Sequence, residues 1–158
     1  MYFKCHFKGF PQRKPAQRKT KSLLRLVKTL IRDNTMKKYR LSDETRLWQW
    51  KSGETTHTTT LRQIIATADF NDVTAGTKGG WIDDARALSQ NGDCWIYDEN
   101  SVVFAGATVS DHARLTLPCT VSHDARISGH CWLDGAEVSH GARISDNVTI
   151  QHSYVRGE

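Results

Sequence analysis

The chain has 158 residues, of which 38% are hydrophobic and 25% charged, with 11 glycines and 3 prolines. This composition excludes collagen-like, coiled-coil and globally disordered proteins. The longest apolar run covers only residues 102–107, which is too short for a transmembrane helix. We therefore expect one domain of ordinary size, or one small domain with a tail.

Positive charge is concentrated at the N-terminus. Residues 1–35 contain ten Lys or Arg and one acidic residue, whereas the other 123 residues contain twelve basic and sixteen acidic ones. The main part of the chain is therefore mildly acidic, which gives no support to specific binding of nucleic acid. Residues 1–22 have a composition typical of disorder, and residues 23–31 have the periodicity of a basic amphipathic helix.

Three interpretations of this basic tail stay open. The abrupt change of composition at Met36 favours the interpretation that Met36 is the true start and that residues 1–35 are upstream sequence translated in frame. A functional tail would associate with an anionic membrane surface or with nucleic acid. A passive tail would do neither.

An aliphatic residue returns at steps of five to seven residues, mostly six, through the C-terminal part of the chain. The eleven positions are Ile96, Val102, Val109, Leu115, Val121, Ile127, Leu133, Val138, Ile144, Ile150 and Val155. A small or modest residue stands two positions before each of them, and turn-forming sequences such as SGH and SDN lie between. Alternation over three residues predicts a short strand, and its repetition predicts a β-solenoid built from hexads.

Three of the four cysteines occupy the small positions of this repeat. We therefore predict Cys94, Cys119 and Cys131 to be core residues rather than nucleophiles. Together with Cys5 they show no zinc-ligand spacing, and no signal peptide accompanies them. We expect no metal site and a reduced, cytoplasmic protein.

The hexad pattern resembles that of the hexapeptide-repeat family, whose fold is a left-handed parallel β-helix with three hexads per coil. Within that family, residues 39–158 are similar to the YdcK-like group of bacterial proteins. The motifs that carry the similarity are DFNDV (69–73), AG (75–76), GGW (79–81), LSQ (88–90) and CWIYD (94–98).

The resemblance implies an all-β protein. We expect a left-handed parallel β-helix over residues 81–158, preceded by a small N-terminal β cap over residues 36–80. Within the cap, a hairpin with its turn at Ser52-Gly53 would cover the open end of the first coil, which otherwise exposes apolar core.

The same resemblance implies an acyltransferase or acetyltransferase, with acetyl-CoA or acyl-CoA as co-substrate, acting as a homo-oligomer, a trimer. Such enzymes use one histidine as general base on the acceptor hydroxyl or amine. With three hexads to a coil, His130 stacks on His112, Asn147 follows in the next coil, and His140 stacks on His123. We therefore predict His130 as the catalytic residue.

Other features favour a non-catalytic protein. Turn corners accept any polar residue, and no insertion longer than one residue interrupts the hexads, whereas active sites of the family usually involve an extruded loop. As the resemblance implies, proteins of this group continue for many more coils, whereas this chain ends at Glu158 in mid-coil. A β-helical scaffold, or a truncated remnant of a longer protein, is the alternative hypothesis.

Two columns of stacked side chains bear on the binding of a metal ion, a ligand or another subunit. We expect no metal ion between His112 and His130, because we assign no carboxylate to their column. Trp95 and Trp132 share an outward column, which would bind a sugar or a neighbouring subunit, or would pack against the cap.

Overall fold

The computed structural model of the protein describes residues 37–158. The predictions made for the basic tail fall on earlier residues and lie outside the described ones. All regular secondary structure within residues 37–158 is β-strand.

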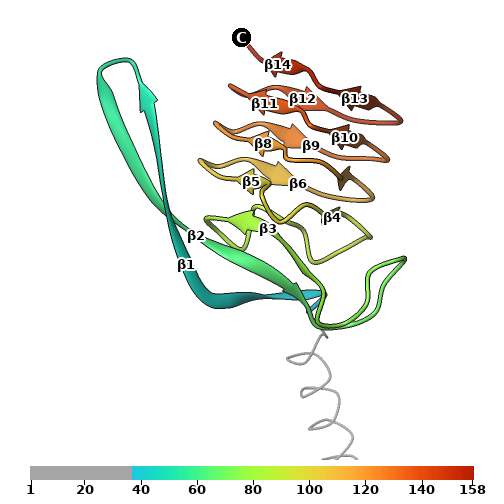
Figure 1. The fold of residues 1–158 in the computed structure, drawn as a ribbon. Coiled ribbons are helices and arrows are strands. Elements are labelled where there is room, and N and C mark those ends of the chain that lie inside the picture. Colours follow the sequence, from blue (N-terminus) through green and yellow to red (C-terminus); the bar gives the residue numbers. More distant parts are fainter. Residues whose placement is uncertain (1–36) are drawn as a thin grey trace, which may run out of the picture. The chain divides into compact units, whose positions relative to one another are not determined.

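The N-terminal part is a long antiparallel hairpin (Figure 1). Its strands β1 (Tyr39–Ser52) and β2 (Thr55–Ala66) pair from end to end, with a break in register between Leu41 and Thr45. The connecting turn contains Gly53, whose φ of 62° is one that glycine adopts without strain. The hairpin predicted from the sequence is confirmed.

The rest of the described chain coils into a parallel β-solenoid of about four turns. Its strands are β3 (Lys78–Ile82), β4 (Trp95–Ile96), β5 (Val102–Val103), β6 (Thr108–Val109), β7 (Arg114–Leu115), β8 (Thr120–Val121), β9 (Arg126–Ile127), β10 (Trp132–Asp134), β11 (Glu137–Ser139), β12 (Arg143–Ile144), β13 (Thr149–Gln151) and β14 (Tyr154–Arg156). They stack in three faces, ordered β3-β5-β8-β11-β14, β4-β7-β10-β13 and β6-β9-β12. β3 also pairs antiparallel with β2, so the hairpin and the first face form one seven-stranded sheet.

The repeated aliphatic positions line the axis of the coils. Leu115, Val121, Ile127 and Leu133 are at most 1% exposed, and the small Cys and Ala positions that precede them are equally buried. In each short strand the small residue and the aliphatic residue two positions later both point toward the axis, and their stacking from coil to coil forms a continuous core. The predicted fold class, an all-β parallel β-helix with an N-terminal β cap, is confirmed.

The hairpin reaches further than the sequence indicated. Its base packs into the core at the first coil, where Tyr39 contacts Trp95 with ring centroids 6.3 Å apart. Its distal half runs beside the coils instead of covering their end (Figure 1). There Trp48 and Trp50 pack against Phe104, with centroids 6.0 and 4.9 Å apart.

The glycines before the first coil allow a close approach of two backbones. A Cβ atom on Gly79 would lie 2.5 Å from the carbonyl oxygen of Ile96, and one on Gly80 would lie 2.4 Å from Cγ2 of the same residue. Only glycine fits at this spacing. These two glycines therefore allow a tight start to the first coil.

Candidate functional site

A groove lies between the distal hairpin and the face formed by β5, β8 and β11. Its volume is about 370 Å³, and we call it the hairpin groove. The residues that line it are Trp48, Gln49, Trp50, Lys51, Phe104, Thr120, Ser122, His123, Glu137, Ser139 and His140. It combines aromatic side chains with several hydrogen-bonding groups, which is the composition typical of ligand sites.

A Ser-His pair occurs twice in the groove, on successive coils. The Nδ1 atom of His123 lies 2.8 Å from Ser122 Oγ, and that of His140 lies 2.8 Å from Ser139 Oγ. The two imidazole rings stack with centroids 4.9 Å apart and an angle of 11° between their planes. The stacking predicted from the repeat is confirmed.

The backbone at these corners explains why the rings align. His123 and His140 have φ angles of 52° and 55°, in the left-handed region that closes a tight corner. Each histidine follows a buried serine, which is Ser122 directly after β8 and Ser139 at the end of β11. The same corner geometry in successive coils therefore projects both rings on the same side.

Burial lowers the pKa of His123 below its ordinary value, and the neighbouring His140 and His57 lower it further, although Asp124 acts in the opposite direction. A neutral imidazole is therefore favoured at this position at neutral pH. Such an imidazole is able to accept a proton, as a general base must.

The hairpin covers this histidine with an aromatic cluster. Trp50 stacks on His57 of β2, at a centroid distance of 5.3 Å, and meets His123 edge to face at 6.0 Å. Phe104 lies 6.1 Å from His123 on the coil side. The Nε1 atom of Trp48 is buried and has no hydrogen-bond partner among the described residues. The hairpin thus supplies one wall of the groove.

The predicted catalytic residue His130 lies at a different corner. It is exposed and stacks on His112, with ring centroids 4.5 Å apart, as predicted. The register of β10 and β13 places Asn147 in the next coil of this column. His130 is not among the residues that line the hairpin groove.

One statement about this column was wrong. A carboxylate does belong to it, because Asp93 Oδ2 lies 3.2 Å from Nδ1 of His112. Asp93 stands three residues before Ile96, as His112 stands three residues before Leu115, so the repeat already contained the signal. Even so, residues 37–158 contain no group of three or more His, Cys, Asp or Glu side chains that could hold a metal ion.

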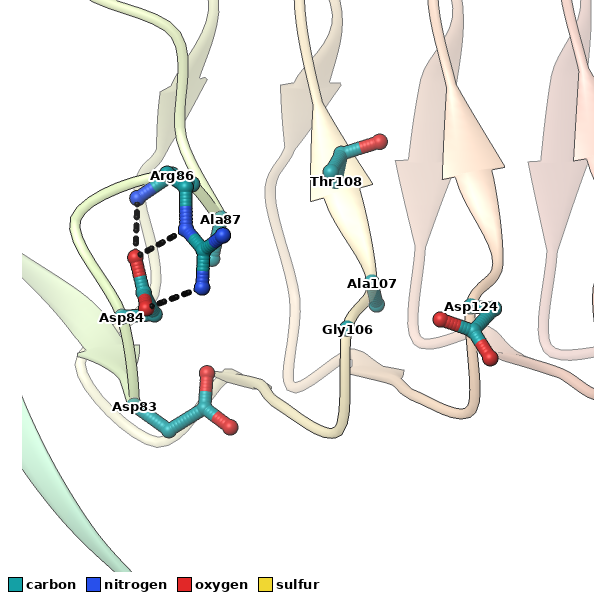
Figure 2. A pocket seen from close by; sticks show the side chains of 8 residues that line it. All are labelled: Asp83, Asp84, Arg86, Ala87, Gly106, Ala107, Thr108 and Asp124. Atoms are coloured by element: carbon teal, nitrogen blue, oxygen red, sulfur yellow. Dashed lines mark hydrogen bonds and ion pairs between the residues drawn. The ribbon is translucent and has the colours of Figure 1, made fainter.

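A second pocket, of about 360 Å³, lies at another corner of the coils (Figure 2). Arg86 forms an ion pair with Asp84, which holds the pKa of that carboxyl at about 2, while Asp83 accepts a hydrogen bond from Ala105 N. Ala105 belongs to the next coil, and Asp124 borders the same space from the coil after that one (Figure 2). The residues that line this pocket include no histidine, so the hairpin groove is the stronger candidate for acid–base chemistry.

The tryptophan column divides into two different roles. Trp95 is fully buried and packs against Tyr39 and Phe70 of the cap. Trp132 is 49% exposed, and its Nε1–H donates to Thr116 Oγ1. Of the alternatives predicted for this column, packing against the cap is therefore the correct one for Trp95. All three cysteines of the repeat are buried, as predicted for core residues, and none of them forms a disulfide within residues 37–158.

The fold and its hexads define a class, the hexapeptide-repeat β-helix proteins. No protein-family profile matches the chain. A protein of Escherichia coli named "uncharacterized acetyltransferase YdcK" is 47% identical over 106 residues, which are 67% of this chain and 32% of that protein. The chain belongs to the YdcK-like group of hexapeptide-repeat proteins. It spans about a third of the length of the relative that it matches. No helix among the described residues is long and apolar enough to cross a membrane.

Proposed function

We propose that this protein transfers an acyl group from acyl-coenzyme A to a hydroxyl or amine acceptor, and that His123 is the general base. The observation that carries the proposal is a histidine with a lowered pKa that lines the 370 Å³ groove and is tied to Ser122 through Nδ1. The name of the similar protein, an acetyltransferase, supports the reaction class.

In this proposal each residue near His123 has a part. With its proton on Nδ1, His123 donates a hydrogen bond to Ser122 Oγ, and its Nε2 lone pair is free to accept the acceptor's proton. The acceptor oxygen or nitrogen then attacks the thioester carbonyl, and the coenzyme A thiol leaves. Burial favours the neutral form of His123 most, and His140 favours it further, because two cofacial imidazolium ions would repel each other.

His130 remains the competing prediction. Its support is the column itself, in which Asp93 holds Nδ1 of His112 and His130 stacks above. A carboxylate that fixes one imidazole is a common way to orient a base. The carboxylate contacts His112 rather than His130, and both rings lie at an exposed corner.

The test is a set of single substitutions in the full chain. Release of coenzyme A from acetyl-coenzyme A is measured with glucose, glucosamine and spermidine as representative acceptors. Loss of a general base lowers turnover by roughly 100-fold or more, so we expect that effect from His123→Asn. His152→Asn is the matched control, because it changes a corner histidine outside the groove. Loss of turnover in His130→Asn with full turnover in His123→Asn would overturn the assignment of the base.

The alternative function is a non-catalytic β-helical scaffold. It predicts no saturable binding of acetyl-coenzyme A even at millimolar concentration. The homo-oligomer implied by the family resemblance also stays a prediction, and light scattering on the purified chain tests it.

A further inference from the structure

A lysine and a cysteine are in contact at the junction of the cap and the first coil. Lys38 Nζ lies 3.2 Å from Cys94 Sγ, although the two residues are 56 positions apart. Lys38 is 6% exposed, and Cys94 is fully buried. The ammonium group also donates to the carbonyl oxygens of Cys94 and Gly92, at 2.9 and 3.2 Å.

This contact sets Cys94 apart from the other two cysteines of the repeat. Within residues 37–158, it is the one cysteine whose sulfur has a lysine nitrogen in hydrogen-bond contact. Cys119 Sγ and Cys131 Sγ instead lie 3.6 and 2.8 Å from backbone carbonyl oxygens. Burial raises the pKa of the Cys94 thiol, and the adjacent Lys38 ammonium opposes that rise by stabilising the thiolate, which is the reactive form of cysteine.

The sulfur lies directly beneath a turn at the protein surface. Sγ of Cys94 is 3.6 Å from the carbonyl oxygen of Ser89 and 3.9 Å from that of Asn91. Gln90, Asn91 and Gly92 of this turn are exposed. A small local opening of the turn is therefore enough to admit a molecule as small as hydrogen peroxide.

We propose that Lys38 and Cys94 form a peroxide-dependent covalent bond between nitrogen and sulfur, a sulfenamide. The Cys94 thiolate attacks hydrogen peroxide, so that the sulfur becomes a sulfenic acid and one water leaves. Lys38 Nζ, after losing a proton, attacks this sulfur and displaces the hydroxyl as a second water. One thiol, one ammonium group and one peroxide thus give one S–N bond, two waters and one proton. The sulfur is oxidised by two electrons, and the peroxide is reduced.

The bond would tie the start of β1 to the first coil. Lys38 immediately precedes β1, and Cys94 immediately precedes β4. A cross-link between them closes a long loop and restricts the unfolded chain. We therefore expect a higher urea midpoint after peroxide treatment, and a return to the original midpoint after addition of dithiothreitol.

Mass spectrometry of the full chain tests the proposal, in a Cys5→Ser background that removes the cysteine outside the described residues. After peroxide treatment we expect a product that has lost two hydrogens and gained no oxygen, with the peptides of Lys38 and Cys94 joined. Cys131→Ala is the matched control and retains the cross-link. Lys38→Arg keeps the positive charge but loses the amine, so Cys94 should accumulate added oxygen instead. A Cys94 that stays a thiol, or that gains oxygen while Lys38 remains free, would overturn the proposal. None of these readouts requires transferase activity.

Discussion

The imidazole rings of His123 and His140 lie 4.9 Å apart and within 11° of parallel, on successive coils of the β-helix. Each ring contacts the hydroxyl of the serine before it. The repeat thus produces two copies of one polar unit, and the hairpin folds over the first of them. The proposed acyl transfer depends on this covered position.

The first prediction concerns the dependence of stability on pH. The pKa of His123 is lower in the folded protein than its ordinary value of about 6.5. The folded state therefore binds fewer protons than the unfolded state once the pH falls below that ordinary value. The stabilising contribution is complete above it and is lost as the pH falls through the lowered pKa. Urea unfolding at about pH 8 and about pH 5 should show a smaller loss of stability in His123→Asn than in the native chain. An unchanged pH dependence in this variant would contradict the burial of the imidazole.

The second prediction concerns the distal hairpin. Trp50 joins the hairpin to Phe104 and His123, so Trp50→Ala should cost about 2 kcal/mol, less than a fully buried tryptophan. Hydrogen exchange should show lost protection in the distal half of the hairpin, with the coils unchanged. Leu47→Ala on the same strand is the control, because Leu47 is 71% exposed. Equal effects of the two substitutions would show that the hairpin does not pack on the coils.

The third prediction tests the close contact at the first coil. In Gly80→Ala the new Cβ would lie 2.4 Å from Ile96 Cγ2 and 2.7 Å from the Ser101 carbonyl oxygen. We expect a loss of about 3 kcal/mol in the free energy of unfolding, because a well-packed contact must open. Gly53→Ala has open space around it and only a positive φ to adopt, so it should cost about 1 kcal/mol. A neutral Gly80→Ala would contradict the position of β3.

The fourth prediction tests the axis of the coils. Leu115 is completely buried in a middle coil, so Leu115→Ala should cost about 3 to 5 kcal/mol. Leu117, two residues later, is 42% exposed, and Leu117→Ala should cost less than about 1 kcal/mol. Urea unfolding of both variants measures the difference. Similar losses would mean that the hexads are out of register with the core.

Much of the fold was predictable because the hexad repeat is local. Each aliphatic position, such as Leu115 or Leu133, shows its inward direction through neighbours two residues away, so the sequence indicates the coils directly. The stacking of His112 on His130 follows from the period alone. Asp93 was missed, although the same period places it in that column.

The hairpin groove was not predictable in the same way. Trp50 and His57 mark a hairpin, but nothing in their local pattern indicates that they pack against Phe104 and His123, which are far along the chain. Such long-range contacts depend on the direction in which the hairpin leaves the first coil. The sequence therefore indicated a row of corner histidines and did not show which of them is covered.

A titration of the full chain with acetyl-coenzyme A, followed by NMR of the histidine side chains, tests the central claim most directly. Single His→Asn variants assign each resonance. We predict saturable shifts for His123 and His140, which line the hairpin groove, and none for His152, which lies outside it. Shifts confined to His112 and His130, or no shift at millimolar ligand, would contradict the claim that the hairpin groove is the site of acyl transfer.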